Sequence, residues 1–158
     1  MTMQATLQSV ERTVTVKATR ERAFEVFTER FDAWWPRSHH LLPEDMAEAV
    51  LERREGGRWY ERSVKGDECD WGRVLAWEPP ERVLLSWEIK ADFSGLEEGA
   101  ANGSEVEVRF VEIDPETTRV ELEHRHFERH GAGAEKMREA VGSEGGWGAG
   151  LQAFADLL

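Results

Sequence analysis

The last twelve residues, WGAGLQAFADLL, constrain the fold more than any other part of the sequence. Trp147, Leu151, Phe154 and Leu158 recur at spacings of four, three and four, which places them on one face of an α-helix. A helix this short is marginal in water by itself, so it must bury that face against another part of the chain. The sequence therefore predicts a terminal amphipathic helix that lies on a larger apolar surface.

That surface is predicted to be a β-sheet, because most of the chain between residues 47 and 127 alternates between apolar and polar side chains. The predicted strands cover residues 7–17, 47–54, 58–64, 71–77, 83–89, 105–110 and 120–126. Short turns such as Gly56-Gly57 and Asp114-Pro115 join consecutive strands. Consecutive strands with short turns indicate an antiparallel meander of about seven strands.

Two short helices are predicted between the first and second strands. Thr19 is a suitable N-cap for a helix with Ala23, Phe24 and Phe27 at helical spacing. A second helix, over residues 32–35, ends before Pro36. The predicted architecture is therefore α+β.

Composition indicates one globular domain over residues 1–158, with 40% hydrophobic and 33% charged residues. The net charge of −12 argues against nucleic-acid binding, which requires a basic patch. No apolar run reaches membrane-spanning length, and the single Cys69 fits a reducing compartment. We expect a cytoplasmic protein that needs no cofactor, with monomer and homodimer both left open.

Four strings of residues resemble those of the SRPBCC superfamily, whose members have the helix-grip fold. They are GGRWYE at 56–61, WGRVLAWEPPERVLLSW at 71–87, ELEHRHFERHG at 121–131 and GGWGAGLQAFADLL at 145–158. Within that superfamily they look most like the branch named for the activator of a heat-shock-protein ATPase. The resemblance implies a curved sheet that wraps around the C-terminal helix and leaves a cavity between the two.

Such a cavity would suit a small apolar or aromatic ligand, and the seven tryptophans of the chain would supply contact area. The residues proposed to line it are Trp34, Trp59, Trp87, Phe110, Leu122, His124, Trp147, Leu151 and Phe154. Trp34 and Trp35 also have a second interpretation, in which they plug the open end of the grip beneath the first helix.

His124 and His126 share one face of the last predicted strand, where two imidazoles could bind one metal ion. No third ligand stands at a firm spacing, so no metal is predicted and His124 is interpreted as an inward-facing polar group. His39 and His40 follow Pro36 in a loop, where solvent exposure or packing in a lid is expected.

Glu61 shares its strand face with Trp59, so it faces inward if Trp59 does. A buried carboxylate is costly unless it is paired, and Arg73 and His124 are the proposed partners. A one-residue shift in register would instead put Glu61 in water, and the sequence leaves both arrangements open.

Three functions are compatible with these residues. The first is binding of a small hydrophobic or aromatic molecule. The second is a cyclase- or dehydratase-like reaction in which His124 and Glu61 act as a general acid–base pair. The third, implied by the resemblance, is regulation of a heat-shock-protein ATPase.

Overall fold

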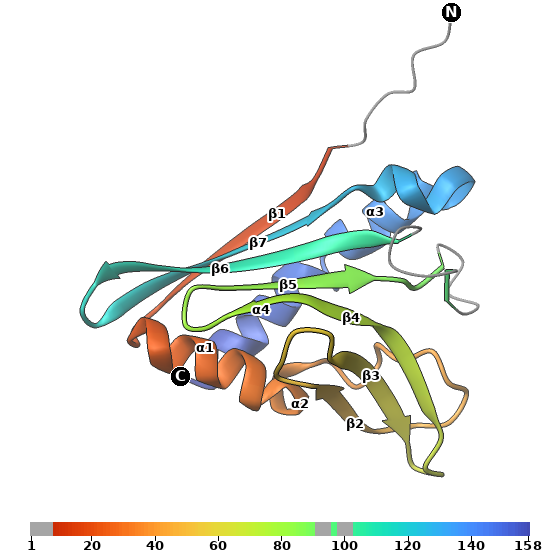
Figure 1. Ribbon diagram of the computed structural model, residues 1–158, viewed down its shortest axis with the longest axis horizontal. Coiled ribbons are helices and arrows are strands. Elements are labelled where there is room, and N and C mark those ends of the chain that lie inside the picture. The colour runs from red at the N-terminus through yellow and green to blue at the C-terminus, as the bar shows by residue number, and fades with distance from the viewer. Residues whose placement is uncertain (1–7, 91–95, 98–102) are drawn as a thin grey trace, which may run out of the picture.

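A computed structural model describes residues 8–90, 96–97 and 103–158 of the chain. The helices and strands follow the order predicted from the sequence (Figure 1). They are β1 (Val10–Val16), α1 (Arg20–Glu29), α2 (Phe31–Trp34), β2 (Met46–Leu51), β3 (Arg58–Ser63), β4 (Glu68–Glu78), β5 (Arg82–Trp87), β6 (Ser104–Asp114), β7 (Thr117–Arg125), the 3₁₀ helix η2 (Phe127–Gly133), α3 (Ala134–Gly142) and α4 (Trp147–Ala155). None of these helices has the length and apolar character that a membrane span requires.

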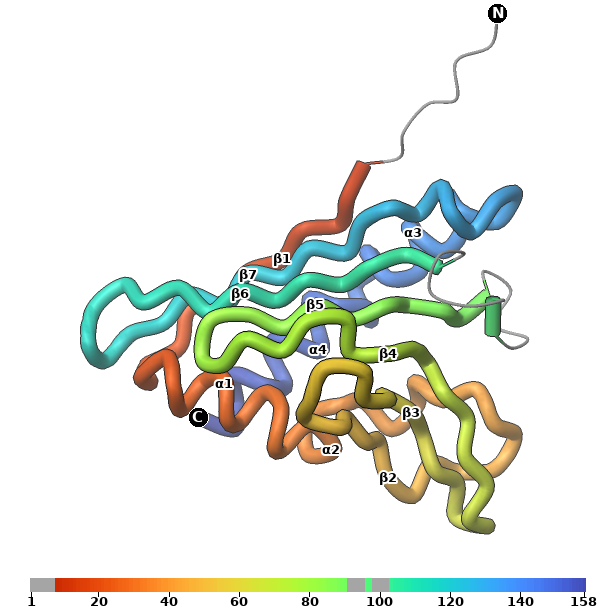
Figure 2. Tube along the Cα trace, viewed as in Figure 1, coloured from red at the N-terminus to blue at the C-terminus, as the bar shows by residue number. Residues whose placement is uncertain are grey.

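All seven strands form one antiparallel sheet in the order β1-β7-β6-β5-β4-β3-β2. Strands β2 to β7 form a meander, and β1, the first strand of the chain, pairs with the last strand, β7. The register shifts in the pairings of β2 with β3, β3 with β4 and β4 with β5. Such irregularities bend strands, and the traces in Figures 1 and 2 show this half of the sheet curving away from the β6–β7 half. The sheet is therefore a half-barrel, as the helix-grip prediction requires.

Helix α1 begins where the sequence predicts. The side chain of Thr19 accepts a hydrogen bond from the backbone N–H of Arg22 at 3.1 Å, which satisfies one free donor of the first turn. Ala23, Phe24 and Phe27 are buried beneath the helix. Helix α1 thus covers one end of the sheet.

Helix α4 crosses the concave face of the sheet and buries Trp147, Leu151 and Phe154. This confirms the predicted amphipathic stripe for three of its four members. The fourth, Leu158, is 39% exposed because the helix ends at Ala155. The prediction that Leu158 is buried was therefore wrong.

The end of the grip beneath α1 is packed solid with aromatic rings. Phe27 lies 5.3 Å from Phe154, 5.6 Å from Phe110 and 4.7 Å from Trp34, measured between ring centroids. The contacts of Phe27 with Phe154 and Phe110 are edge-to-face, and that with Trp34 is tilted. Edge-to-face pairs each add about 0.5–1.5 kcal/mol beyond the burial of area. Open space between sheet and helix therefore has to lie at the opposite end.

Candidate functional site

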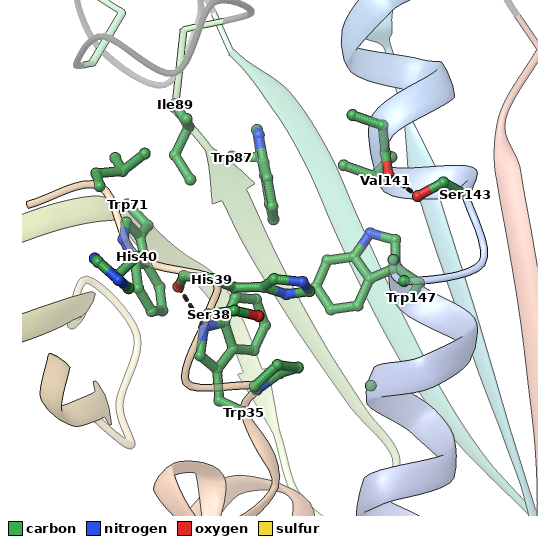
Figure 3. Close-up of a pocket in the computed structure, with 16 residues that line it drawn as sticks. Trp35, Ser38, His39, His40, Trp71, Trp87, Ile89, Val141, Ser143 and Trp147 are labelled. Carbon is green, nitrogen blue, oxygen red and sulfur yellow. Dashed lines mark hydrogen bonds between the residues drawn. The ribbon is translucent and has the colours of Figure 1, made fainter. Parts of the chain in front are cut away.

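A cavity of about 430 Å³ lies at that opposite end, between β4 and β5, the loop after α2, and the turn that joins α3 to α4 (Figure 3). Ser38 and His39 border the cavity and are exposed, so it opens to solvent beside residues 36–41, here called the mouth loop. The cavity is lined by Trp35, Pro36, Ser38, His39, His40, Leu41, Trp71, Trp87, Ile89, Ala140, Val141, Ser143, Gly145, Gly146, Trp147 and Gly150.

Four indole rings line the cavity. The ring of Trp35 lies 5.0 Å from that of Trp71 and 5.7 Å from that of Trp147, and Trp87 lies 5.7 Å from Trp147. These rings come from the residue after α2, from β4, from β5 and from the start of α4. The fold thus gathers aromatic residues from four distant segments around one space.

The protein itself accepts the N–H groups of three of these indoles. Trp35 donates to the backbone carbonyl of His39 at 3.1 Å, Trp71 to Oε1 of Glu61 at 3.0 Å, and Trp147 to Nδ1 of His124 at 3.0 Å. The N–H of Trp87 is buried and has no partner among the described residues. The wall therefore offers a ligand mainly ring faces and C–H edges.

Polar contacts are available at the mouth loop, where His39 and His40 line the cavity. Partial burial lowers the pKa of His39, which keeps its imidazole neutral at pH 7. Nδ1 of His40 lies 2.7 Å from the carbonyl oxygen of Leu42 and donates a hydrogen bond to it. Nε2 of the same ring is then the nitrogen that can accept a hydrogen bond. Both rings can hydrogen-bond to an oxygen-bearing ligand.

Glu61 is fully buried, which decides between the two registers that the sequence left open. Its carboxylate accepts hydrogen bonds from the backbone N–H groups of Leu41 and Leu42 as well as from Trp71. The predicted pairing with Arg73 or His124 was wrong, because Arg73 bonds to Asp70 and His124 bonds to Ser104 and Trp147. Glu61 holds the mouth loop and one wall of the cavity, and it is not among the lining residues.

His124 is also fully buried, and it belongs to a chain of hydrogen bonds that starts at Trp147. Nε2 of His124 lies 2.7 Å from the hydroxyl of Ser104, and the same hydroxyl lies 2.8 Å from Nε2 of His130. Nδ1 of His130 lies 3.4 Å from Oε1 of Glu97. The chain connects the cavity wall with β6, β7 and η2.

The roles of donor and acceptor along this chain of hydrogen bonds can be assigned in one consistent way. Trp147 donates to Nδ1 of His124, so the proton of that ring is on Nε2 and points at Ser104. The backbone N–H of Ser104 donates to Nε2 of His130 at 3.2 Å, so His130 carries its proton on Nδ1. Burial, with the neighbouring His130, holds the pKa of His124 well below its usual value. Burial also lowers the pKa of His130, although Glu97 opposes this shift.

The residues proposed from the sequence to line the cavity fall into two groups. Trp87 and Trp147 line it. The other seven are buried behind the wall or at the packed end of the grip: Trp34, Trp59, Phe110, Leu122, His124, Leu151 and Phe154. The structure thus does not bring these seven into contact with the open space.

His126 does not share the face of His124. The backbone of His126 is left-handed, with a φ of 66°, and strand β7 ends one residue earlier, at Arg125. Nδ1 of His126 lies 3.5 Å from Oε1 of Glu128. The prediction that both histidines lie on one strand face was wrong. No cluster of three or more metal-ligating side chains occurs among the residues that the structure describes.

Comparison with known proteins agrees with this geometry. Residues 17–158 match the family described as activator of Hsp90 ATPase homolog 1-like protein, AHSA1. The chain belongs to this family. No curated protein sequence gives a significant match. The AHSA1 assignment and the half-barrel sheet confirm the helix-grip fold.

The solved structures that resemble this AHSA1 chain include two with more than 30% identity. The anthrahydroquino-γ-pyrone synthase Txn09, in complex with SUM, is 38% identical, with 99% of this chain and 100% of that chain covered and a TM-score of 0.66. The self-sacrificing resistance protein CalC from Micromonospora echinospora is 34% identical, with 94% and 92% covered and a TM-score of 0.66.

A third structure carries less weight. The HSP90 activator PFC0360w from Plasmodium falciparum is 18% identical, with 74% of this chain and 71% of that chain covered and a TM-score of 0.51. At this identity the similarity shows the fold alone.

Proposed function

We propose that the chain binds a flat, largely apolar aromatic molecule in the cavity between the sheet and the α3–α4 turn. The observation that carries this proposal is the wall of four indoles, Trp35, Trp71, Trp87 and Trp147, around a space of about 430 Å³. Ligand sites commonly have about 300–1,000 Å³ and apolar walls with a few polar groups. The likeness to Txn09, whose name contains a fused aromatic ring system, supports the same class of ligand.

The test is a fluorescence titration with 2-hydroxyanthracene, a three-ring probe with one oxygen. Ala140 lines the cavity from α3, so Ala140→Trp adds an indole where the ligand would lie. Glu139 is exposed on the same helix, and Glu139→Trp is the matched control. We expect Ala140→Trp to weaken binding at least tenfold and Glu139→Trp to leave it unchanged. Equal affinity in both variants would refute the proposal.

Ring closure is a second candidate function, favoured by the likeness to Txn09 over 99% of this chain and by the position of His39. A neutral imidazole at the cavity mouth can remove the proton of a phenol as its oxygen attacks a side-chain ketone. The new C–O bond gives a hemiketal, which loses water to form a γ-pyrone. In this reaction His39 replaces the pair of His124 and Glu61 inferred from the sequence.

An ortho-hydroxyaryl 1,3-diketone tests this second function. If it operates, the protein accelerates chromone formation, and His39→Gln abolishes the acceleration while binding of 2-hydroxyanthracene persists. An unchanged rate in His39→Gln would exclude His39 as the base. Regulation of a heat-shock-protein ATPase stays a prediction that no feature of the structure tests.

A further inference from the structure

Two buried polar side chains stand directly behind the aromatic wall. Glu61 and His124 are each 0% exposed, and neither lines the cavity. Each accepts the N–H of one lining indole, Trp71 for Glu61 and Trp147 for His124. Burying such groups is costly unless they are fully hydrogen-bonded, so their place beside the cavity calls for a functional explanation.

The carboxylate of Glu61 is held by hydrogen bonds from the loop after α2 and from β4. Its carboxylate accepts hydrogen bonds from the backbone N–H of Leu41, the last residue of the mouth loop, from that of Leu42, which follows it, and from the indole of Trp71 on β4. Through these three hydrogen bonds one carboxylate ties the indole of Trp71 to the end of the mouth loop. The N–H of Trp71 is therefore held outside the cavity.

His124 is fixed in the same manner. Ser104 accepts the proton on Nε2, so Nδ1 is left as an acceptor that points at the indole of Trp147. The imidazole also stacks on Phe127 with 4.4 Å between ring centroids, which limits rotation of the ring. Figure 3 shows the six-membered ring of Trp147 pointing toward the centre of the site, with its nitrogen on the side away from the mouth loop.

We propose that Glu61 and His124 are positioning residues that set ligand specificity, because they keep the N–H groups of Trp71 and Trp147 out of the cavity. This inference rests on the proposed binding function. The walls formed by Trp71 and Trp147 then offer no hydrogen bond, and the N–H of Trp87, which has no partner in the described part of the chain, is itself buried. The polar contacts proposed for the ligand lie at the mouth loop, on His39 and His40. The preferred ligand is a fused aromatic molecule with oxygen at one edge only, and its hydrocarbon edge faces inward.

Two probes of one ring system test this orientation. 2-Hydroxyanthracene carries oxygen at one end, and 2,6-dihydroxyanthracene carries it at both ends. A second hydroxyl buried against the inner wall would lose its hydrogen bonds to water without replacement. We expect the wild-type chain to bind the diol at least tenfold more weakly than the mono-ol. Equal affinities would overturn the proposal.

Substitutions then assign this discrimination to the two positioning residues. His124→Phe keeps a ring but removes the acceptor, so Trp147 is free to offer its N–H to the second hydroxyl. The ratio of the two dissociation constants should fall at least threefold. His124→Asn restores an acceptor near Nδ1 and should keep the wild-type ratio, as should Glu61→Gln, whereas Glu61→Met should lower it.

Val120→Ala is the control for a general loss of packing, since Val120 is fully buried and lies outside the lining. It should weaken the binding of both probes equally and leave the ratio unchanged. If His124→Phe behaves like Val120→Ala, a structural role alone remains and the proposal fails.

Nitrogen NMR of the ligand-free chain separates this inference from the proposed function. We expect His124 to be protonated on Nε2 only, and the N–H resonance of Trp147 to shift in His124→Phe but not in Val120→Ala. Protonation of His124 on Nδ1 would overturn the positioning role even if both probes bind. If neither probe binds the wild-type chain, the binding function fails, and with it the specificity role.

Discussion

The hydroxyl of Ser104 lies 2.8 Å from Nε2 of His130, and this contact closes a buried chain of hydrogen bonds that runs from Trp147 to Glu97. Each ring nitrogen in the chain has one role, donor or acceptor, and only neutral imidazoles satisfy every role. A proton added to either histidine would place two donors against each other. The network beside the cavity is therefore sensitive to pH.

We predict that the protein loses stability as the pH falls below about 6.5, the usual pKa of histidine. The folded-state pKa of both His124 and His130 is lowered, so the unfolded chain binds protons that the folded chain does not. Stability is therefore fully present above pH 6.5 and decreases as the pH falls toward the folded-state values. Between pH 7.5 and 5.5 the loss should be about 1–3 kcal/mol.

Urea unfolding at both pH values measures this loss. The carboxyl groups with a lowered pKa have ordinary values of 3.8 to 4.5, so they contribute mainly below this window; they are Asp32, Asp70, Glu107 and Asp114. His124→Asn should remove a large share of the dependence, and His130 and His39, whose pKa is also lowered, should account for the rest. A free energy of unfolding that stays constant or rises on acidification would contradict the prediction.

Ser104→Ala tests the central link of the chain. Without the hydroxyl, the Nε2 proton of His124 has no acceptor in a site that water does not reach, which costs roughly 1–3 kcal/mol. Ser63→Ala is the comparison, because among the residues that the structure describes its buried hydroxyl accepts only the backbone N–H of Lys65, at 3.2 Å. Urea unfolding should show the larger loss for Ser104→Ala. A larger loss for Ser63→Ala than for Ser104→Ala would mean that this chain of hydrogen bonds does not stabilise the fold.

Gly145 and Gly146 form a matched pair in the turn that lines the cavity. A Cβ at Gly146 would lie 2.0 Å from the carbonyl oxygen of Val141, so the turn must shift. A Cβ at Gly145 would meet no atom within 4 Å. Gly146→Ala should lower the free energy of unfolding by about 2 kcal/mol, and Gly145→Ala should change it little. Thermal unfolding distinguishes them, and equal melting temperatures would contradict the predicted clash.

The fold could be predicted from the sequence because strands and helices leave periodic patterns of apolar residues. The alternation of strand residues correctly predicted that Trp87 and His124 face inward. The helical spacing of α4 correctly predicted that Leu151 is buried. Periodicity gives the face on which a side chain lies, but not its position along the grip. For that reason Phe110 and Phe154 could not be recognised as members of the packed end.

The cavity lining was harder to predict, because much of it comes from segments without a period. Ser38 and His39 belong to a loop, and Ser143 and Gly145 to a turn. The signals available were the Trp34-Trp35 pair before Pro36 and the glycine-rich string before α4. The partners of Glu61 were missed because backbone N–H donors from a loop leave no trace in the identity of a residue.

The most direct test of the account is a crystal structure of the chain grown with 2-hydroxyanthracene. We predict a flat molecule within the four indoles of Trp35, Trp71, Trp87 and Trp147, with its hydroxyl at the mouth loop. A ligand bound elsewhere, or a cavity filled by the protein's own side chains, would contradict the proposed function.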